Sequence, residues 1–377
     1  MEKFQKCHLY AKSISAYIKE ETLLLFFKES GRVYGLEKEH AALFLQIDEL
    51  LQKHEEGSIQ TFFSQIPAEY IKSLIDLRLG RYESDDMEEY EPPLEIGCFR
   101  EDEKERVCYD TGRILFYVAF ENREVREKIE PIFSHLCVKR GGGKKVNVDF
   151  SLKDSKWQIL FNGRPVAAAA PKETLPLTLQ ENMIIVHYQS EPYLMAIHAG
   201  AVAIESKAVI FPGSSGSGKS TLTAALAADG HSLFSDEIAL VDCEGELSSI
   251  PFCMNIKEGS WGVLRNTIPA LSQKESYLRF DGRRVKFAPP LNLSQKKSPV
   301  DMVIFPKYSA GSDLLLKRLS ACETLKRIKE AGYQLGGELS ERSFEKILSY
   351  VLEAPAYLLE YGSLEEAKRQ VERLVRG

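Results

Sequence analysis

A run of glycines and serines in the second half of the chain has the residue types and spacing of a phosphate-binding loop. Its glycines let the backbone curl until successive N–H groups converge on phosphate oxygens, and a following helix adds its positive end. The lysine of the pattern neutralises phosphate charge, and the next hydroxyl is a magnesium ligand. The alternative is a turn that only connects two elements. The residues expected to bind the nucleotide are Gly213, Ser214, Ser215, Gly216, Ser217, Gly218, Lys219, Ser220 and Thr221.

The elements around this loop are those that a nucleotide site requires. An apolar strand at Ala208–Phe211 precedes the loop, a helix at Lys219–Ala228 follows it, and a strand at Ser232–Phe234 comes next. Strand, loop, helix and strand in this order predict a parallel α/β core. The loop by itself does not distinguish a kinase from an ATPase or a GTPase.

Two carboxylates follow the second of these strands. Asp236 and Glu237 come directly after Ser235, and in a parallel sheet they would lie at the carboxyl edge, beside the phosphates. One carboxylate can orient Mg²⁺, and the other can accept a proton from an incoming hydroxyl. The alternative is a pair of solvated acids at a strand end.

The stretch from His198 to Asp242, HAGAVAIESKAVIFPGSSGSGKSTLTAALAADGHSLFSDEIALVD, resembles the core of the HPr kinase/phosphorylase family. The resemblance covers roughly residues 195 to 375. It implies ATP and Mg²⁺, with Asp236 as general base, Lys219 on the phosphates, and Ser220, Asp236 and Glu237 at the metal. The family typically has two aspartates where this chain has Asp236 and Glu237. By the resemblance, His198 would position the γ-phosphate or the nucleophile. From its place in an apolar strand alone, His198 would be a satisfied core residue.

Further cations are expected near the phosphates. The segment Met254–Lys257 resembles the family segment that brings an arginine to the active site, so Lys257 is a catalytic candidate that would stabilise transferring charge. A surface lysine is the alternative. Arg283 and Arg284 are weaker candidates for phosphate or acidic-peptide contact. The segment that serves phosphorolysis in the family does not match, so we expect a kinase without the reverse activity.

The chain divides by composition into four segments. The expected fold class is α/β, with an HPr kinase-like phosphate-loop domain preceded by a small winged-helix-like α+β domain and a β-rich middle region. In the middle region, strands are expected at Val107–Tyr109, Ile114–Phe120, Val146–Phe150, Trp157–Phe161 and Met183–His187. The predicted segments are the small domain at 1–82, an acidic linker at 83–93, the middle region at 94–193 and the catalytic domain at 194–377.

The N-terminal segment suggests a substrate class. A hairpin of Leu23–Phe27 and Arg32–Leu36 leading into a helix is similar to the winged-helix elements that bind leader peptides in ribosomal peptide biosynthesis. The chain also resembles the kinases of lasso-peptide clusters, which implies a serine-bearing precursor peptide as acceptor. A structural helical cap is the alternative for the segment. For the whole chain, the alternatives are a kinase of a folded HPr-like carrier or of a small hydroxylated metabolite, and a nucleotide-dependent regulatory switch.

The composition argues against some classes of binding partner and favours a cytoplasmic location. The net charge of −6 gives no positive field that would attract nucleic acid or an anionic membrane. Seven cysteines without a CxxC pair are typical of reduced thiols in the cytoplasm. The N-terminus lacks the apolar run of a secretory signal. The family precedent of hexamers makes a homo-oligomer an expectation that the residues themselves do not test.

Overall fold

The N-terminal region is an antiparallel sheet, in the order β1–β2–β3–β4, with helices α1 and α3 on one face. Its hairpin is the predicted one, since β3 pairs with β4 in antiparallel register. The computed structural model describes residues 3–54, 59, 62–63, 65–79, 93–139 and 141–377, so residues 83–92 of the predicted linker lie outside it. The elements are β1 (Gln5–Cys7), β2 (Ile14–Lys19), β3 (Thr22–Phe27), β4 (Val33–Glu37), α1 (Lys38–Lys53) and α3 (Ala68–Arg78).

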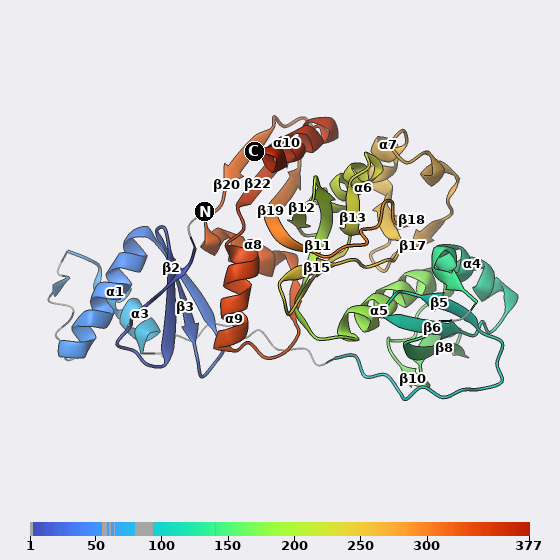
Figure 1. Ribbon diagram of the computed structural model, residues 1–377, viewed down its shortest axis with the longest axis horizontal. Coiled ribbons are helices and arrows are strands. Elements are labelled where there is room, and N and C mark those ends of the chain that lie inside the picture. The colour runs from blue at the N-terminus through green and yellow to red at the C-terminus, as the bar shows by residue number, and fades with distance from the viewer. Residues whose placement is uncertain (1–2, 55–58, 60–61, 64, 80–92, 140) are drawn as a thin grey trace.

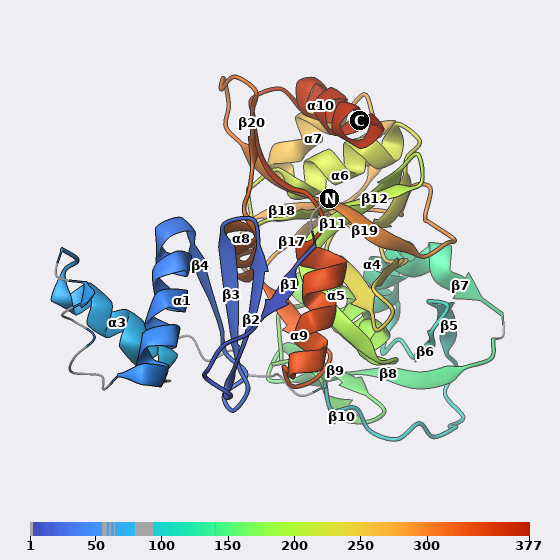
Figure 2. The ribbon, with the colours of Figure 1, turned by 60° about the vertical axis from the view of Figure 1, so that its left-hand side comes forward.

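The other face of this sheet packs against the C-terminal part of the chain. Phe26 of β3 stacks on Phe344 of α9 (Glu341–Ile347), with ring centroids 5.4 Å apart, and Tyr17 meets the same ring edge-on. Lys6 donates to Glu341 at 2.6 Å and to Glu345 at 2.9 Å. Figures 1 and 2 both show α8 (Ala321–Ala331) and α9 beside the sheet. The N-terminal sheet is therefore covered on both faces.

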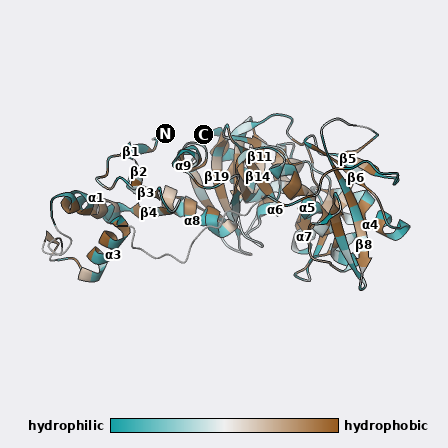
Figure 3. Cartoon of the chain, turned by 90° about the horizontal axis from the view of Figure 1, so that it is seen from below, coloured by the Kyte–Doolittle hydropathy of each residue, from teal (hydrophilic) through white to brown (hydrophobic). Residues whose placement is uncertain are grey.

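The middle region is a mixed sheet in the order β10–β9–β8–β6–β5–β7, with α4 and α5 packed on it. The four strands predicted between Val107 and Phe161 are present. Figure 3 shows hydrophobic colour along β6, both colours on β8, and hydrophilic colour on α4. The elements are β5 (Val107–Asp110), β6 (Ile114–Val118), α4 (Arg123–Phe133), β7 (Cys137–Val138), β8 (Lys144–Lys153), β9 (Lys156–Phe161), β10 (Arg164–Pro165) and α5 (Leu175–Gln189).

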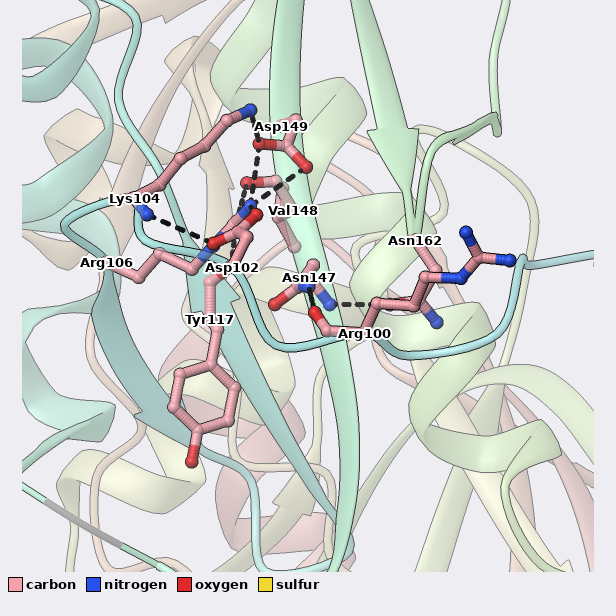
Figure 4. Close-up of polar contacts among 9 residues, drawn as sticks. All are labelled: Arg100, Asp102, Lys104, Arg106, Tyr117, Asn147, Val148, Asp149 and Asn162. Atoms are coloured by element: carbon pink, nitrogen blue, oxygen red, sulfur yellow. Dashed lines mark hydrogen bonds and ion pairs between the residues drawn. The ribbon is translucent and has the colours of Figure 1, made fainter.

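An extended segment enters this region and is fixed to the sheet by Arg106 (Figure 4). The guanidinium of Arg106 donates to the Tyr117 carbonyl at 3.0 Å and to the Val148 carbonyl at 3.2 Å. It also pairs with Asp102 at 2.6 Å and Asp149 at 2.9 Å. Because Arg106 is almost fully buried and satisfied on all sides, the cluster has the features of a structural anchor.

The strand predicted at Met183–His187 is wrong, because these residues belong to helix α5. Nearly every side chain of α5 is buried, including polar Gln180, Asn182 and His187. A helix that is buried all round has no polar face, so its sequence lacks the 3.6-residue period by which amphipathic helices are recognised. This misassignment bears on the site, since α5 reaches it.

The C-terminal region is built on a large mixed sheet with the phosphate loop at one edge. Helices α6 and α10 contact each other on one face, and α8 and α9 lie on the other. Its elements are β11 (Tyr193–Ile204), β12 (Lys207–Pro212), α6 (Lys219–Ala228), β13 (Ser232–Ser235), β14 (Ile238–Asp242), β15 (Glu246–Ser248), β19 (Ser298–Tyr308), β20 (Leu315–Arg318), α8, β21 (Tyr333–Leu335), α9, β22 (Ala356–Tyr361) and α10 (Leu364–Arg376).

The predicted parallel core requires a correction. β12, β19 and β22 are parallel to one another, but the long strand β11 runs antiparallel between β12 and β13. The two strands that flank the loop helix are therefore not neighbours. Since both are antiparallel to β11, they still point the same way and end at the same edge of the sheet.

A small antiparallel sheet, in the order β16–β18–β17, stands beside α6 and the phosphate loop. Its elements are β16 (Met254–Lys257), helix α7 (Glu258–Leu264), β17 (Ser276–Leu278) and β18 (Arg284–Ala288). The turn between β17 and β18 is compact, since Arg279 N donates to the Arg283 carbonyl at 2.9 Å. Across the described ranges, no helix combines the length and the apolar character needed to cross a bilayer.

Candidate functional site

The sheet register brings the phosphate loop and the acidic pair to opposite sides of one strand. Pro212, which precedes the loop, pairs with Ala199 of β11. On the other side of β11, the Ala199 amide donates to the Glu237 carbonyl at 3.1 Å. Two strand spacings separate the two segments, which is about 10 Å between backbones. Side chains that point out of this edge can therefore meet over the end of β11.

The loop is held in shape from the side away from its opening. Tyr308 N donates to the Ser217 carbonyl at 3.0 Å, and the Tyr361 hydroxyl lies 3.4 Å from the Gly218 carbonyl. Gly218 has a φ of +93°, and a Cβ there would collide with the Tyr361 hydroxyl, so only glycine fits. Among the described residues, no side chain caps the start of α6. Its first N–H groups are free to bind an anion.

Lys219 is buried at the base of this loop. It is 5% exposed, and its ammonium nitrogen finds no hydrogen-bond partner among the residues that the structure describes. Burial lowers the pKa of Lys219, against the opposing charges of Glu237 and Asp236. A buried cation without a hydrogen-bond acceptor is costly, and phosphate oxygens are the acceptors that would satisfy it in this setting.

The acidic pair has strongly unequal environments. Asp236 is 4% exposed, and its Oδ2 accepts from the Asn255 amide at 3.0 Å. Burial, together with the charge of Glu237, raises the pKa of Asp236. Burial also acts to raise the pKa of Glu237, but the charge of Lys219 and the bond from His198 outweigh it and lower that pKa. The two carboxyls thus differ in proton affinity, as an acid–base site requires.

His198 lies against the acidic pair and not on the open side of the loop. Its Nε2 is 3.2 Å from Glu237 Oε1, and its Nδ1 is 3.0 Å from the Ala331 carbonyl at the end of α8. Both neighbours are hydrogen-bond acceptors, so the ring is held between them. In this position His198 orients the Glu237 carboxylate.

Cations approach the loop from the small sheet. Lys257 Nζ donates to the Ser215 hydroxyl at 2.9 Å, and Arg283 Nη1 lies 3.4 Å from the same oxygen. Arg284 points away, since its guanidinium binds Ser276 on the neighbouring strand. Two like charges that converge on one neutral hydroxyl repel each other, and an anion placed between them would relieve that repulsion.

Helix α5 of the middle region reaches the floor of the site. The Gln180 amide donates to the Cys253 carbonyl and to Asn255 Oδ1, both at 3.0 Å. The next residue, Glu181, is half-buried, and burial together with the charge of Glu237 raises its pKa. The middle region thus contributes directly to the surroundings of the acidic pair.

These residues fit a magnesium-bound nucleotide. The unsatisfied Lys219 ammonium and the free amides at the start of α6 suit the phosphates. The described residues hold no cluster of three or more His, Cys, Asp or Glu side chains arranged for a metal. Mg²⁺ takes one or two carboxylates together with phosphate oxygens and water, so the Asp236–Glu237 pair with Ser220 is a sufficient protein contribution.

Comparisons with known proteins do not establish a function for this chain. No protein-family model matches the chain, and no curated protein matches it. Among solved structures, the Hpr(Ser) kinase/phosphatase from Coxiella burnetii is similar at 13% sequence identity and a TM-score of 0.22. The match covers 48% of this chain and 93% of that chain. At this level of similarity the function has to be inferred from the residues of the site.

The structure places most of the predicted residues together. Residues 213–220, His198, Lys219, the acidic pair and Lys257 surround one edge of the sheet. Thr221 points instead to α7, where its hydroxyl lies 2.5 Å from the Ser260 hydroxyl. His231 lies away from the site and pairs with Glu372 of α10 at 2.9 Å.

Sequence reasoning missed several contributors to the site. Gln180 and Glu181 lie on α5, whose residues Met183–His187 were predicted as a strand. Arg279 lies in the β17–β18 turn, and its charge acts on both Lys219 and Lys257. A signal was available for Arg279, because it stands beside the turn Asp281–Gly282 together with Arg283.

Proposed function

We propose that the protein is an ATP-dependent kinase that transfers the γ-phosphoryl group of ATP to a serine hydroxyl. The observation that carries the proposal is the shared edge of the sheet, where the buried, unsatisfied Lys219 faces a carboxylate pair. A loop that only bound nucleotide would need Lys219 and the amides. The buried Asp236, with its raised pKa, is the further group that proton transfer requires.

The reaction is an in-line displacement. The serine oxygen forms a bond to the γ-phosphorus, the bond from that phosphorus to the β,γ-bridging oxygen breaks, and ADP leaves with the electron pair. Asp236 accepts the hydroxyl proton, and Lys219 with the loop amides compensates the charge of the phosphates. Lys257 and Arg283 extend the positive surface to the side where the transferred group moves.

The remaining polar residues of the site would bind Mg²⁺ or orient the groups that bind it. Mg²⁺, when bound, would supply positive charge that compensates the charge of the phosphates. Ser220, Glu237 and Asp236 are the residues proposed to hold it. His198 fixes the orientation of Glu237 through the contact at 3.2 Å. The Ser235 hydroxyl shapes the turn, since it accepts from the amides of Glu237 and Ile238 at 3.1 Å.

The proposed acceptor is a peptide, and specifically the precursor of a ribosomally made peptide of the lasso type. The N-terminal sheet supports a peptide, because among the described residues β4 pairs with β3 on one side and with no strand on the other. Such an edge can bind an extended leader segment by adding it as a strand. The contact of this sheet with α8 and α9 would hold a bound leader on the catalytic domain.

The test is transfer of label from γ-labelled ATP, with magnesium, to a degenerate peptide library that carries one fixed serine. We expect labelled phosphoserine, and no label when the fixed residue is alanine. Label that appears only on a folded HPr-like carrier or on small alcohols would move the assignment to those acceptors. Nucleotide binding without transfer to any acceptor would reject the kinase and favour a regulatory switch.

Two neighbouring arginines provide a matched pair for the same assay. Arg283→Gln removes the cation beside Ser215, and transfer should fall by about 10-fold or more because one charge contact to the reacting group is lost. Arg284→Gln removes an equal charge that binds Ser276 instead, and transfer should stay near the native rate. Equal losses in the two variants would mean that net charge matters and the specific contact does not.

A further inference from the structure

A chain of hydrogen bonds joins the middle region to the carboxylate of Asp236. Gln180 of α5 donates from its Nε2 to Asn255 Oδ1, and the backbone N–H of Asn255 donates to Asp236 Oδ2, each at 3.0 Å. Gln180 also binds the Cys253 carbonyl at 3.0 Å, two residues earlier on the same segment. The amide of Gln180 therefore holds the start of β16 at two points, on Cys253 just before the strand and on Asn255 within it.

Every member of this chain is enclosed. Gln180 is 0% exposed, and Asn255 and Asp236 are each 4% exposed. The orientation of the Gln180 amide is fixed by its partners, since a backbone carbonyl can only accept and the NH₂ group must face it. Buried hydrogen bonds of this kind set geometry closely, because no water can replace a lost partner.

The arrangement is poorly explained by stability alone. The Gln180 carbonyl oxygen is buried and has no hydrogen-bond partner among the residues that the structure describes. An apolar side chain of similar size would avoid leaving this oxygen unsatisfied. The hydrophobic side chains of α5 itself, such as Leu177, Leu179 and Met183, already pack it into the core.

We propose that Gln180 is a positioning residue for phosphoryl transfer. By clamping β16, it fixes the Asn255 N–H and through it the direction in which the Asp236 carboxylate faces the acceptor hydroxyl. The inference rests on the proposed function, in which Asp236 is the base. It also gives the middle region a role in the chemistry, since a shift of α5 would move the base. Gln180 itself touches neither nucleotide nor acceptor.

The test compares two buried amides on the same helix. Gln180→Met keeps the size of the side chain and removes both donated bonds. The matched control is Asn182→Leu, because Asn182 is also buried but its amide donates to the Thr178 carbonyl within α5, at 2.8 Å. Initial rates of label transfer to the serine peptide library give kcat and the KM for ATP. Deuterium exchange of the segment 252–257 reports on the Asn255 amide without any turnover.

We expect Gln180→Met to lower kcat by about 10- to 100-fold, as a misplaced catalytic group does, with little change in the KM for ATP. Exchange at Asn255 should become faster. Asn182→Leu should keep kcat within about twofold of the native value. In an Asp236→Asn background, Gln180→Met should lower the residual rate no further, because the group that it positions is already gone.

Asn255→Ala provides a second route if Gln180→Met folds poorly. Asn255→Ala removes the acceptor of the hydrogen bond from Gln180 Nε2 and leaves α5 unchanged, so it should reproduce the loss of kcat. The proposal is overturned if either variant keeps native kcat and slow exchange at Asn255, or if Gln180→Met lowers the Asp236→Asn rate by its full factor. A native protein that transfers no label would instead overturn the kinase assignment. Exchange would then still decide whether Gln180 holds the Asn255 amide on Asp236.

Discussion

Replacing Asp236 by asparagine should reduce phosphoryl transfer by about 10²- to 10⁴-fold, the range that loss of a general base produces. The change preserves the shape of the side chain and its contact with the Asn255 amide, so the fold should persist. The affinity for magnesium-nucleotide should change much less than the rate. Rates come from the labelled-peptide assay and affinity from calorimetry.

A buried carboxylate outside the site controls for this change. Asp242 is also 4% exposed, and it pairs with Lys297 and binds the amides of Glu244 and Glu246. Asp242→Asn should lower the melting temperature and leave the rate per folded molecule near native. If Asp236→Asn retained native transfer, Asp236 could not be the base, and the proposed mechanism would lose its central residue.

Replacing Lys219 by methionine should have two opposite effects. The affinity for magnesium-ATP should fall by about 10- to 150-fold, the value of one charge-assisted contact of 1.5–3 kcal/mol. The nucleotide-free protein should become more stable, because Lys219 has no hydrogen-bond partner among the described residues and the cost of burying its charge exceeds its attraction to Glu237 and Asp236, as its lowered pKa indicates. Calorimetric titration and thermal unfolding measure the two effects.

Lys368 is the matched control for the stability effect. It is 7% exposed, like Lys219, but its ammonium pairs with Asp229 at 2.8 Å and with Glu365 at 2.9 Å. Lys368→Met should therefore destabilise the protein and leave nucleotide affinity unchanged. A Lys219→Met protein that was less stable and bound ATP as tightly as the native chain would show that Lys219 serves the fold.

The parts of the site that the sequence predicts are those encoded within a short segment. Glycine spacing, Lys219 and the acidic pair all lie within 25 residues of one another (213 to 237). The residue types of a loop between a strand and a helix can be recognised within such a segment, although Tyr308 and Tyr361 from distant strands also hold the loop in shape. The approach of Lys257 to the loop was predicted from the resemblance, and its contact with Ser215 is consistent with that role.

The parts that the sequence does not predict depend on distant partners. That β11 would run between β12 and β13 is decided by pairing across the sheet, which the order of elements does not specify. Arg283 and Arg284 are identical in residue type and adjacent in the sequence. Because side chains alternate along the hairpin, Arg283 contacts the loop and Arg284 contacts Ser276. The contribution of Gln180 was not predicted, because α5 is buried on all sides and its apolar residues therefore show no helical periodicity.

The most direct test of the central claim is a crystal structure of the protein with Mg²⁺ and a non-hydrolysable ATP analogue. We predict that the phosphates lie in residues 213–220 with the γ-phosphate on Lys219 Nζ. A serine hydroxyl should then fit between the γ-phosphorus and the Asp236 carboxylate. A nucleotide bound on another face, or a γ-phosphate turned away from Asp236 with Lys219 still unsatisfied, would contradict the account.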